Sequence, residues 1–297
     1  MSYRNNIAAV VLHFRTAECT LQCLRSLYRE GVQCVVVVDN SEDEGRSVSH
    51  MRQGIDELKA LGLHIKLITP SRNLGFAQGV NVALDVLTFG RAIDVLLINS
   101  DALLESGSLG HMVDELKNAG FVVPSVRVDS GAKTSSLVGY YQSMFALVLR
   151  NGHLGTICYP SGCCLLIRRD QIRRGLLDSD FFFYGEDVEL GRKLQDSKVG
   201  FVECRDATVF HPGSVSAKNG SMFYEYHMNR GHWLLARKLA RNRMQFVLFL
   251  FTRCVSLPLR ATVRSLRFHS WVPWYALVAA TVDVLRGYSR NLTPPAS

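Results

Sequence analysis

The chain has 297 residues, 47% of them hydrophobic, so it is long enough to bury a sizeable core. Its net charge of +8 is concentrated at one end, because residues 228–297 hold eleven Lys/Arg and a single acid. The rest of the chain is close to neutral, and this argues against a nucleic-acid-binding domain in residues 1–227. The eight cysteines form no Cys-x-x-Cys pair and no Cys/His ligand spacing, which predicts reduced core thiols in a cytosolic protein and excludes a disulfide framework or a zinc site.

Short apolar runs alternate with amphipathic segments along the first third of the chain. Residues 7–12, 34–38 and 64–69 are apolar runs of strand length, and helical spacing is found around Leu24 and at residues 48–61. Strands that alternate with helices in this way predict βαβ units with right-handed crossovers. The expected fold is therefore α/β with a mostly parallel sheet.

Polar residues end two of the predicted strands. The strand at 34–38 runs into Asp39, Asn40 and Ser41, and a fourth predicted strand, at 95–98, runs into Asn99, Ser100 and Asp101. Open α/β sheets bind ligands at the carboxyl ends of their strands, so one acid is placed to hold a nucleotide and the other its metal-bound diphosphate. A carboxylate at this position suits a hard divalent cation that also binds phosphate and water. The alternative is that Asp101 only caps the next helix.

Two common phosphate-binding loops are absent from the sequence. It contains no Gly-x-x-x-x-Gly-Lys-Ser/Thr loop, and the first strand is not followed by Gly-x-Gly-x-x-Gly, which argues against an ATPase and a dinucleotide dehydrogenase. A glycine-punctuated turn at residues 73–81 leads instead into a helix that reaches about Leu87. Further strands are expected at residues 121–124, 161–167 and 199–203.

Two later positions carry candidate chemistry. The aromatic residues 181–184 precede Glu186 and Asp187, which begin a predicted helix. Acids in a first turn are favoured by the helix dipole, so capping is the alternative to a catalytic role. His211 follows the last strand in a Pro-Gly loop, where a histidine is usually structural, although a position near the active edge of the sheet favours a metal role.

Six motifs, in this order, resemble those of one family: Asp39-Asn40-Ser41, residues 73–81, Asn99-Ser100-Asp101, Ser161-Gly162, residues 186–190, and His211-Pro212-Gly213-Ser214. Over about residues 5–230 the sequence resembles the inverting, metal-dependent glycosyltransferases of family 2, which have the GT-A fold. Within that family it is most similar to bacterial rhamnosyltransferase-type enzymes that build cell-surface polysaccharides. Each motif is weak alone, and the ordered set is specific.

The resemblance implies a role for each motif. It implies that Asp39 holds the nucleobase and ribose and that Asp187 is the catalytic base, with Glu186 beside it. Asp101 is expected to bind a Mg²⁺ or Mn²⁺ ion that bridges the donor diphosphate, and His211 to complete its ligand shell. The other residues implied at the nucleotide site are Asn40, Ser41, Asn73, Gly75, Asn81, Asn99 and Ser100, and those implied at the substrate site are Ser161, Gly162 and Tyr184.

Two positions depart from the family pattern. Asn99 stands where the first acid of an Asp-x-Asp motif is usual, so the metal shell has one carboxylate fewer. His13-Phe14 replaces the usual Tyr-Asn at the end of the first strand.

The expected chemistry is a single displacement without a glycosyl-enzyme intermediate. A carboxylate takes the proton of the acceptor hydroxyl as that hydroxyl attacks the anomeric carbon. A divalent cation stabilises the negative charge on the leaving diphosphate. Base and metal must then lie on opposite sides of the donor sugar, and a base on a later loop with a metal at the strand ends satisfies this requirement.

The last part of the chain differs in character. We expect a GT-A domain at residues 1–221 and a helical, basic and aromatic extension at residues 222–297. Arginines alternate there with Trp, Phe and Leu, a pattern typical of a helix in the interface of an anionic membrane. The alternatives are helices packed on the catalytic domain, or a homodimer interface. Neither a signal peptide nor an uninterrupted membrane-spanning run of about 18–20 apolar residues is expected.

The combined hypothesis is an inverting glycosyltransferase, peripheral to the cytoplasmic face of the membrane. It moves a sugar, by resemblance L-rhamnose from dTDP-rhamnose, to a hydroxyl of a lipid-linked or polysaccharide acceptor. One alternative is a metal-dependent nucleotidyltransferase, although residues 13–18 make a poor phosphate-cradling loop. The other is a non-catalytic nucleotide-sugar-binding partner at the membrane.

Overall fold

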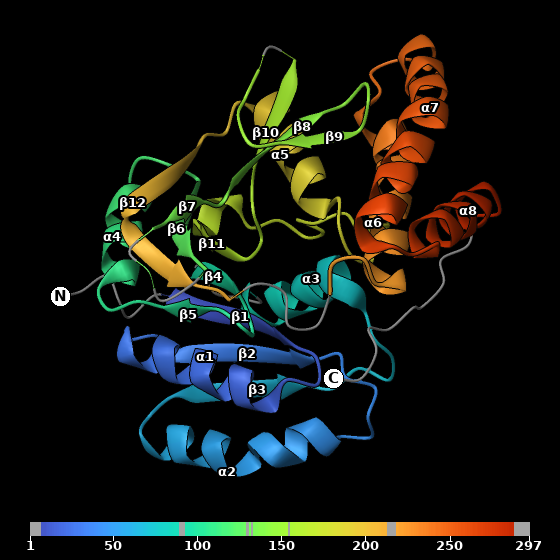
Figure 1. Ribbon diagram of the computed structural model, residues 1–297. Helices are drawn as coiled ribbons and strands as arrows, with labels where there is room; N and C mark the ends of the chain where they lie inside the picture. Colours follow the sequence, from blue (N-terminus) through green and yellow to red (C-terminus); the bar gives the residue numbers. More distant parts are fainter. Residues whose placement is uncertain are drawn as a thin grey trace.

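A computed structural model describes residues 7–88, 93–128, 131, 133–153, 155–212 and 218–287. Its centre is a sheet with helices on both faces, and a smaller sheet and the last three helices lie at the end of the molecule opposite α2 (Figure 1). The α/β fold with a mostly parallel sheet is therefore confirmed.

The N-terminal half of the central sheet is parallel. Its strands lie in the order β3-β2-β1-β4, and each is paired in parallel with its neighbour. The bounds are β1 (Ile7–His13), α1 (Ala17–Arg29), β2 (Cys34–Asp39), α2 (Arg46–Ala60), β3 (His64–Ile68), α3 (Gly75–Thr88) and β4 (Asp94–Asn99). The register places His13 beside Asp39, and Leu12 beside Asn99, so the polar ends of these strands meet at one edge.

The rest of the sheet is mixed. It continues from β4 in the order β11-β6-β12-β5, where β6 and β12 run parallel to each other and β11 and β5 run against their neighbours. The bounds are β5 (Leu103–Leu104), α4 (Ser108–Leu116), β6 (Phe121–Arg127), β7 (Ser135–Ser136), β11 (Cys164–Ile167), a 3₁₀ turn (Arg169–Gln171), α5 (Glu186–Ser197) and β12 (Phe201–Phe210). A separate three-stranded sheet is formed by β8 (Val138–Gln142), β9 (Leu147–Leu149) and β10 (Thr156–Pro160).

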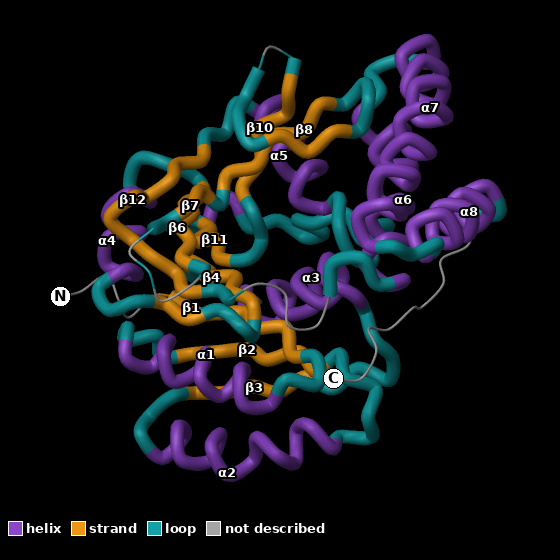
Figure 2. Tube along the Cα trace, in the orientation of Figure 1, coloured by secondary structure: helices purple, strands orange, loops and turns teal. Residues whose placement is uncertain are grey.

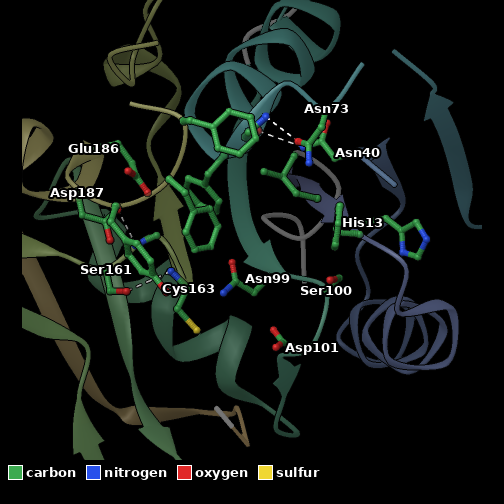
Figure 3. A pocket seen from close by; sticks show the side chains of 18 of the residues that line it. His13, Asn40, Asn73, Asn99, Ser100, Asp101, Ser161, Cys163, Glu186 and Asp187 are labelled. Atoms are coloured by element: carbon green, nitrogen blue, oxygen red, sulfur yellow. Dashed lines mark hydrogen bonds between the residues drawn. The ribbon is translucent and has the colours of Figure 1, made fainter. Parts of the chain in front are cut away.

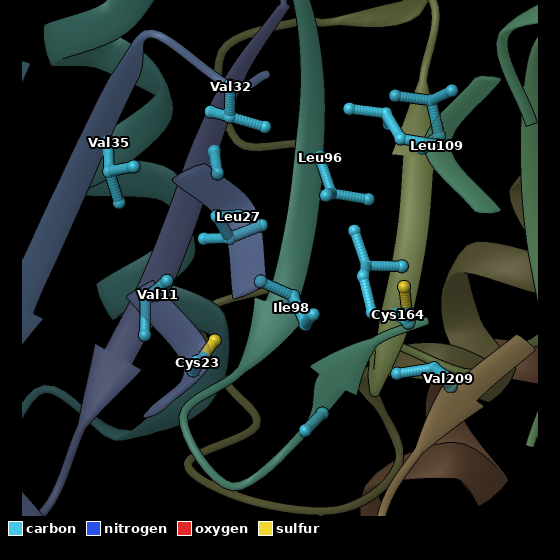
Figure 4. Close-up of a cluster of buried hydrophobic side chains, with 14 of the residues drawn as sticks. Val11, Cys23, Leu27, Val32, Val35, Leu96, Ile98, Leu109, Cys164 and Val209 are labelled. Atoms are coloured by element: carbon cyan, nitrogen blue, oxygen red, sulfur yellow. The ribbon is translucent and has the colours of Figure 1, made fainter. Parts of the chain in front are cut away.

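Each face of the central sheet carries its own apolar core. On one face, helices α1, α2 and α4 pack on residues such as Val11, Val35 and Leu96, and Figure 4 shows this cluster. On the other face, α3 and α5 pack on alternate residues of the same strands, such as Val10 and Val36. Full burial of one such side chain stabilises the fold by roughly 1.5–3 kcal/mol, which explains why strands covered on both faces are continuously apolar.

Three helices complete the described chain: α6 (Met222–Leu239), α7 (Arg243–Phe268) and α8 (Val272–Leu285), visible as the long helical segments in Figure 2. The Ser221 hydroxyl and the Asn242 side-chain oxygen cap α6 and α7 by accepting hydrogen bonds from backbone N–H groups. A third core joins these helices to the small sheet and to α5; its members include Tyr141, Val188, Leu235, Phe249 and Leu277. The helical character of the extension is confirmed, and the extension packs on the small sheet and α5.

Three of the five arginines of α7 face the protein, whereas the sequence suggested an arginine face directed at a membrane surface. Arg253 is fully buried, and its guanidinium donates to the carbonyl oxygens of His232 at 2.8 Å and Phe249 at 3.1 Å. Arg260 and Arg264 bind the carboxylate of Glu225, which is 0% exposed, at 3.0 Å and 2.6 Å. A buried carboxylate needs such partners, so these arginines fix α7 to α6.

Helix α7 is also long and apolar enough to cross a membrane by length and composition, a weak criterion that buried helices pass as well. In the most apolar window of this helix, 28% of residues are buried inside the protein. Among the described residues it is the single helix that meets this criterion.

Candidate active site

A cavity lies where the polar strand ends, the aromatic loop and the start of α5 meet (Figure 3). Twelve of the fifteen predicted site residues line it: Asn40, Asn73, Gly75, Asn99, Ser100, Asp101, Ser161, Gly162, Tyr184, Glu186, Asp187 and His211. Segments far apart in the sequence therefore converge at one place.

Asp101 and His211 form a pair on one wall of the cavity. Asp101 lies two residues after β4, and His211 directly follows β12, where its backbone N–H donates to the carbonyl of Arg127 at 2.8 Å. The Nε2 atom of His211 is 3.1 Å from Oδ1 of Asp101, and the two side chains are only 14% and 10% exposed. The predicted pairing of these two residues at the sheet edge is thus present. Gly213 and Ser214, the end of the His211 motif, lie outside the described residues.

This pair fits a divalent cation. Two donor atoms about 3 Å apart can occupy neighbouring corners of an octahedron around an ion with bonds of about 2.1 Å. Within the described ranges no group of three or more His, Cys, Asp or Glu side chains is placed to hold a metal. Among the described residues Asp101 and His211 could hold such an ion, and its remaining positions would suit diphosphate oxygens and water.

Glu186 and Asp187 occupy the opposite wall, at the start of α5. Helix α5 begins after Gly185, whose φ of +112° only glycine adopts readily, and a Cβ there would lie 2.5 Å from the ring of Phe181. Asp187 accepts a hydrogen bond from the backbone N–H of Gly162 at 3.1 Å. Figure 3 shows Asp187 and Asp101 on different sides of the cavity, with Cys163 and Asn99 between them.

Burial raises the pKa of both adjacent acids. Burial and then the charge of Asp187 raise the pKa of Glu186 to about 8. Burial raises the pKa of Asp187 to about 6, and the hydrogen bond from Gly162 acts in the opposite direction. The hydrogen bond that Gly162 donates favours the ionised form of Asp187, so Asp187 is the member of the pair better suited to accept a proton.

The thiol of Cys163 lies close to both walls. Its pKa is raised by burial and then by the charges of Asp101 and Asp187. The thiol is thus kept protonated and inert.

Asn40 and Asn73 build the turn that leads into α3. Asn40 accepts from the N–H of Leu74 at 3.1 Å and donates to the carbonyl of Gly75 at 3.1 Å. Asn73 accepts from the N–H of Gly75 at 2.8 Å. These side chains line the cavity, and their hydrogen bonds to the main chain also stabilise the conformation of the turn.

Three predicted residues lie outside the lining of this cavity. Asp39 is 8% exposed and accepts from the N–H of Ser41, and Ser41 is fully buried beneath the turn. Asn81 faces the chain around Leu177, with its Nδ2 2.7 Å from that carbonyl oxygen, and it tethers α3 to the segment before the aromatic loop. Their role at the nucleotide site stays a prediction.

The comparison with protein families decides the class of protein. The model of glycosyl transferase family 2 matches residues 9–176, which is more than half of the chain. The chain belongs to glycosyl transferase family 2. Comparison with curated protein sequences finds no match.

Solved structures similar to this family 2 glycosyltransferase show its fold. The mannosyltransferase PcManGT from Pyrobaculum calidifontis, in complex with GDP-Man and Mn²⁺, is 18% identical with a TM-score of 0.57, covering 96% of this chain and 88% of its own. GalNAc-T7 with UDP, GalNAc and Mn²⁺ is 15% identical with a TM-score of 0.55, covering 76% of this chain and 47% of its own. Residues 1–349 of S. aureus TarS are 15% identical with a TM-score of 0.50, and the match covers 96% of this chain and 93% of the TarS chain. The predicted GT-A fold is confirmed, and at these identities the likeness concerns the fold alone.

The aromatic wall of the glycosyltransferase cavity was only partly predicted. Phe14, Phe76 and Phe223 line it together with Phe182 and Phe183, and His13 and Cys163 also contribute. Phe76 lies inside the predicted glycine-rich turn and Phe14 follows the first strand, so both could have been identified as neighbours of motifs. Phe223 lies on α6, in the segment assigned to the extension, and no local signal connects it with the site.

Gly75 holds the aromatic loop against α3 in the glycosyltransferase. Its φ is +72°, and an added Cβ would lie 2.4 Å from the carbonyl oxygen of Phe182. That carbonyl also accepts a hydrogen bond from the N–H of Phe76 at 2.7 Å. Only glycine combines this backbone conformation with so close an approach.

Gly75→Ala should therefore lower the free energy of unfolding by about 2–4 kcal/mol, because it adds backbone strain and overpacking. Urea unfolding measures this change. Gly45→Ala is the matched control, since Gly45 has a φ of +80° but no atom within 4 Å of an added Cβ. Its cost should be limited to the strain, about 1–2 kcal/mol. Equal losses in the two variants would show that contact with Phe182 is unimportant.

Proposed function

We propose that this glycosyltransferase transfers a hexose or deoxyhexose from a nucleotide-diphosphate sugar to a hydroxyl group, with inversion, and that Asp187 is the base. One observation carries the proposal: the carboxylate of Asp187 and the pair of Asp101 and His211 lie on different sides of one cavity. Inversion by direct displacement requires this arrangement, because the nucleophile and the leaving group lie on opposite sides of the anomeric carbon.

Asp187 is suited to take the acceptor proton. Its Oδ1 accepts a hydrogen bond from the N–H of Gly162, and burial together with the charge of Asp187 raises the pKa of the neighbouring Glu186, which favours a single negative charge on this wall. A pKa of about 6 leaves Asp187 ionised and still basic enough for general-base catalysis near pH 7.

The opposite wall is suited to the diphosphate of the donor. Asp101 and His211 would hold Mg²⁺ or Mn²⁺, and the bound ion would neutralise the charge that develops on the leaving diphosphate. The Mn²⁺ in the complexes of PcManGT and GalNAc-T7 supports this role. Asn99 and Ser100 line the cavity beside Asp101 and are placed to bind the nucleotide sugar with Asn40 and Asn73.

The finer assignments rest on the sequence motifs. By resemblance the donor is dTDP-L-rhamnose and the acceptor is a lipid-linked or polysaccharide glycan of the cell envelope. Residues 1–221 would carry out catalysis, and residues 222–297 would hold the enzyme where its acceptor lies, at the cytoplasmic face of the membrane. Membership of family 2 favours glycosyl transfer over nucleotidyl transfer.

The test is nucleotide release from a panel of nucleotide sugars in the presence of Mg²⁺, Mn²⁺ or a chelator. We expect metal-dependent release from one donor, with dTDP-rhamnose as the first candidate. Calorimetry on the same panel detects donor binding. Binding without release even with lipid-linked acceptors present would identify a non-catalytic nucleotide-sugar-binding protein, and no binding to any member would contradict the proposal.

A further inference from the structure

The outward face of α7 is apolar along its whole length. Eight side chains on it are between 42% and 81% exposed: Met244, Val247, Leu248, Phe251, Val255, Leu259, Val263 and Leu266. They recur every three or four residues, so they form one continuous stripe, which we call the α7 stripe. A helix of 26 residues is about 39 Å long, so the stripe is far larger than the scattered apolar residues of an ordinary surface.

Helix α8 also carries exposed apolar residues, among them aromatic residues with polar groups. Trp271 and Tyr275 are each 70% exposed, and Val278 is 58% exposed. Together with Trp274, Ala279 and Val282 they line a shallow groove. Trp and Tyr are the residues enriched where a membrane meets water.

The polar face of α7 is already used inside the protein. Arg253 is buried against backbone carbonyls, and Arg260 and Arg264 bind the buried Glu225. These contacts prevent the helix from turning its arginines outward. They would also have to break before α7 could leave the body and span a bilayer, which would strand the Glu225 carboxylate in the interior.

Across residues 222–287 the exposed Lys, Arg, Asp and Glu side chains are all arginines. Five arginines of this segment are exposed: Arg237, Arg241, Arg243, Arg267 and Arg286. The two acids of the same segment, Glu225 and Asp283, are 0% and 2% exposed. A two-fold dimer through this surface would bring arginines together without carboxylates to compensate them. Anionic lipid headgroups would compensate them.

We propose that the α7 stripe and α8 form a surface that inserts flat into one leaflet of an anionic membrane. The driving force is burial of the stripe in the acyl region, and the exposed arginines add attraction for the headgroups. This differs from the polybasic binding that the sequence suggested, because the arginines at the centre of α7 face inward. The inference depends on the proposed lipid-linked acceptor for its purpose, although its test involves no sugar transfer.

The first test is flotation with vesicles of phosphatidylcholine and phosphatidylglycerol at 0.1 M and 1 M salt. The protein should float with the vesicles, and binding should largely persist at 1 M salt because apolar burial is not screened. Leu259→Glu should weaken partitioning by at least about 10-fold. Leu61→Glu is the matched control, because Leu61 is 61% exposed against 64% for Leu259 and follows α2, at the other end of the molecule.

Equal weakening by the two variants, complete loss of binding at 1 M salt, or no flotation of the unmodified protein would each overturn the proposal. Calorimetric binding of the nucleotide-sugar panel to the same samples is expected to be unchanged by either variant. Failure of the membrane surface is thereby separated from failure of the proposed transferase function.

The second test uses Cys254, an exposed free thiol on α7 next to the stripe. An environment-sensitive fluorophore on Cys254, with Cys254→Ser as the labelling control, should shift to the blue when vesicles are added. Brominated lipids should quench it at about 5–10 Å below the headgroups. Quenching at the centre of the bilayer would indicate a spanning helix, and a blue shift that depends on protein concentration without vesicles would indicate a dimer; both outcomes would contradict the proposal.

Discussion

Asp187→Asn should lower the turnover number by about 10²–10⁴-fold and leave donor binding close to that of the unmodified enzyme. The amide oxygen can still accept the hydrogen bond that Gly162 donates, so the start of α5 keeps its position. At neutral pH the amide cannot take the proton from the hydroxyl group of the sugar acceptor. Steady-state transfer rates and calorimetric donor binding measure the two effects separately.

The pH profile adds a second readout for Asp187. Because the folded-state pKa is raised to about 6 and the ionised form is the active one, turnover should rise with pH through about 6 and then level off. This rising limb should be absent from the residual activity of the variant. Asp196→Asn is the control on the same helix, since the Asp196 side chain is 55% exposed. Rates near those of the unmodified enzyme in the Asp187 variant would assign the base to another group.

Asp101→Asn should weaken Mn²⁺ binding in the presence of a nucleoside diphosphate by at least about 100-fold, since the loss of even an outer-shell partner of a metal typically costs 10–100-fold. In the proposed metal site Asp101 would supply the carboxylate, and the change removes its charge while keeping a side-chain oxygen next to His211, which lies 3.1 Å from Asp101 in the unmodified protein. The fold should therefore remain intact. Electron paramagnetic resonance of free and bound Mn²⁺ gives the affinity directly.

Two further variants define the metal site. His211→Gln should also weaken Mn²⁺ binding, but less, because an uncharged ligand is lost. Asp114→Asn is the control, with a carboxylate that is 72% exposed and remote from the cavity lining. Unchanged Mn²⁺ affinity in both the Asp101 and His211 variants would show that the metal binds elsewhere or that the reaction does not use this pair.

The central sheet was predictable because its strands are covered on both faces. Burial on both faces makes Val35 to Val38 and Val95 to Ile98 continuously apolar, a pattern that is easily recognised. Helix α4 was missed although Leu109, Met112 and Leu116 follow helical spacing, because nine residues are too few for a distinct signal. The small sheet was missed because its strands are short, and Leu147 and Val148 on its edge are exposed.

The site was predictable to the extent that parallel strand ends meet at one edge. That rule brings Asn99 and Asp101 to the same edge of the sheet as the turn after β2, with β1 between them. It does not tell which polar side chains line a cavity and which support it. Asn81 has main-chain partners 96 residues away, so only the folded chain shows its supporting role.

The direction in which α7 faces was likewise not predictable. An amphipathic pattern shows that a helix has two faces, but it does not show which of them meets the protein. Here the partner that decides is Glu225 on α6, a carboxylate with no local relation to Arg260 or Arg264 in the sequence.

The core shared by α5 and the C-terminal helices makes the two a single cooperative unit. Val188, one residue after the proposed base, packs in the same cluster as Leu235, Phe249 and Leu277. Any deletion that removes α7 and α8 also removes the packing that fixes Asp187, so loss of activity after truncation would say nothing about where the enzyme resides. Substitutions confined to the outer surface of α7 can change membrane binding without disturbing the proposed catalytic residues. Substitutions on its inner surface would disturb the core that also holds Val188, next to Asp187.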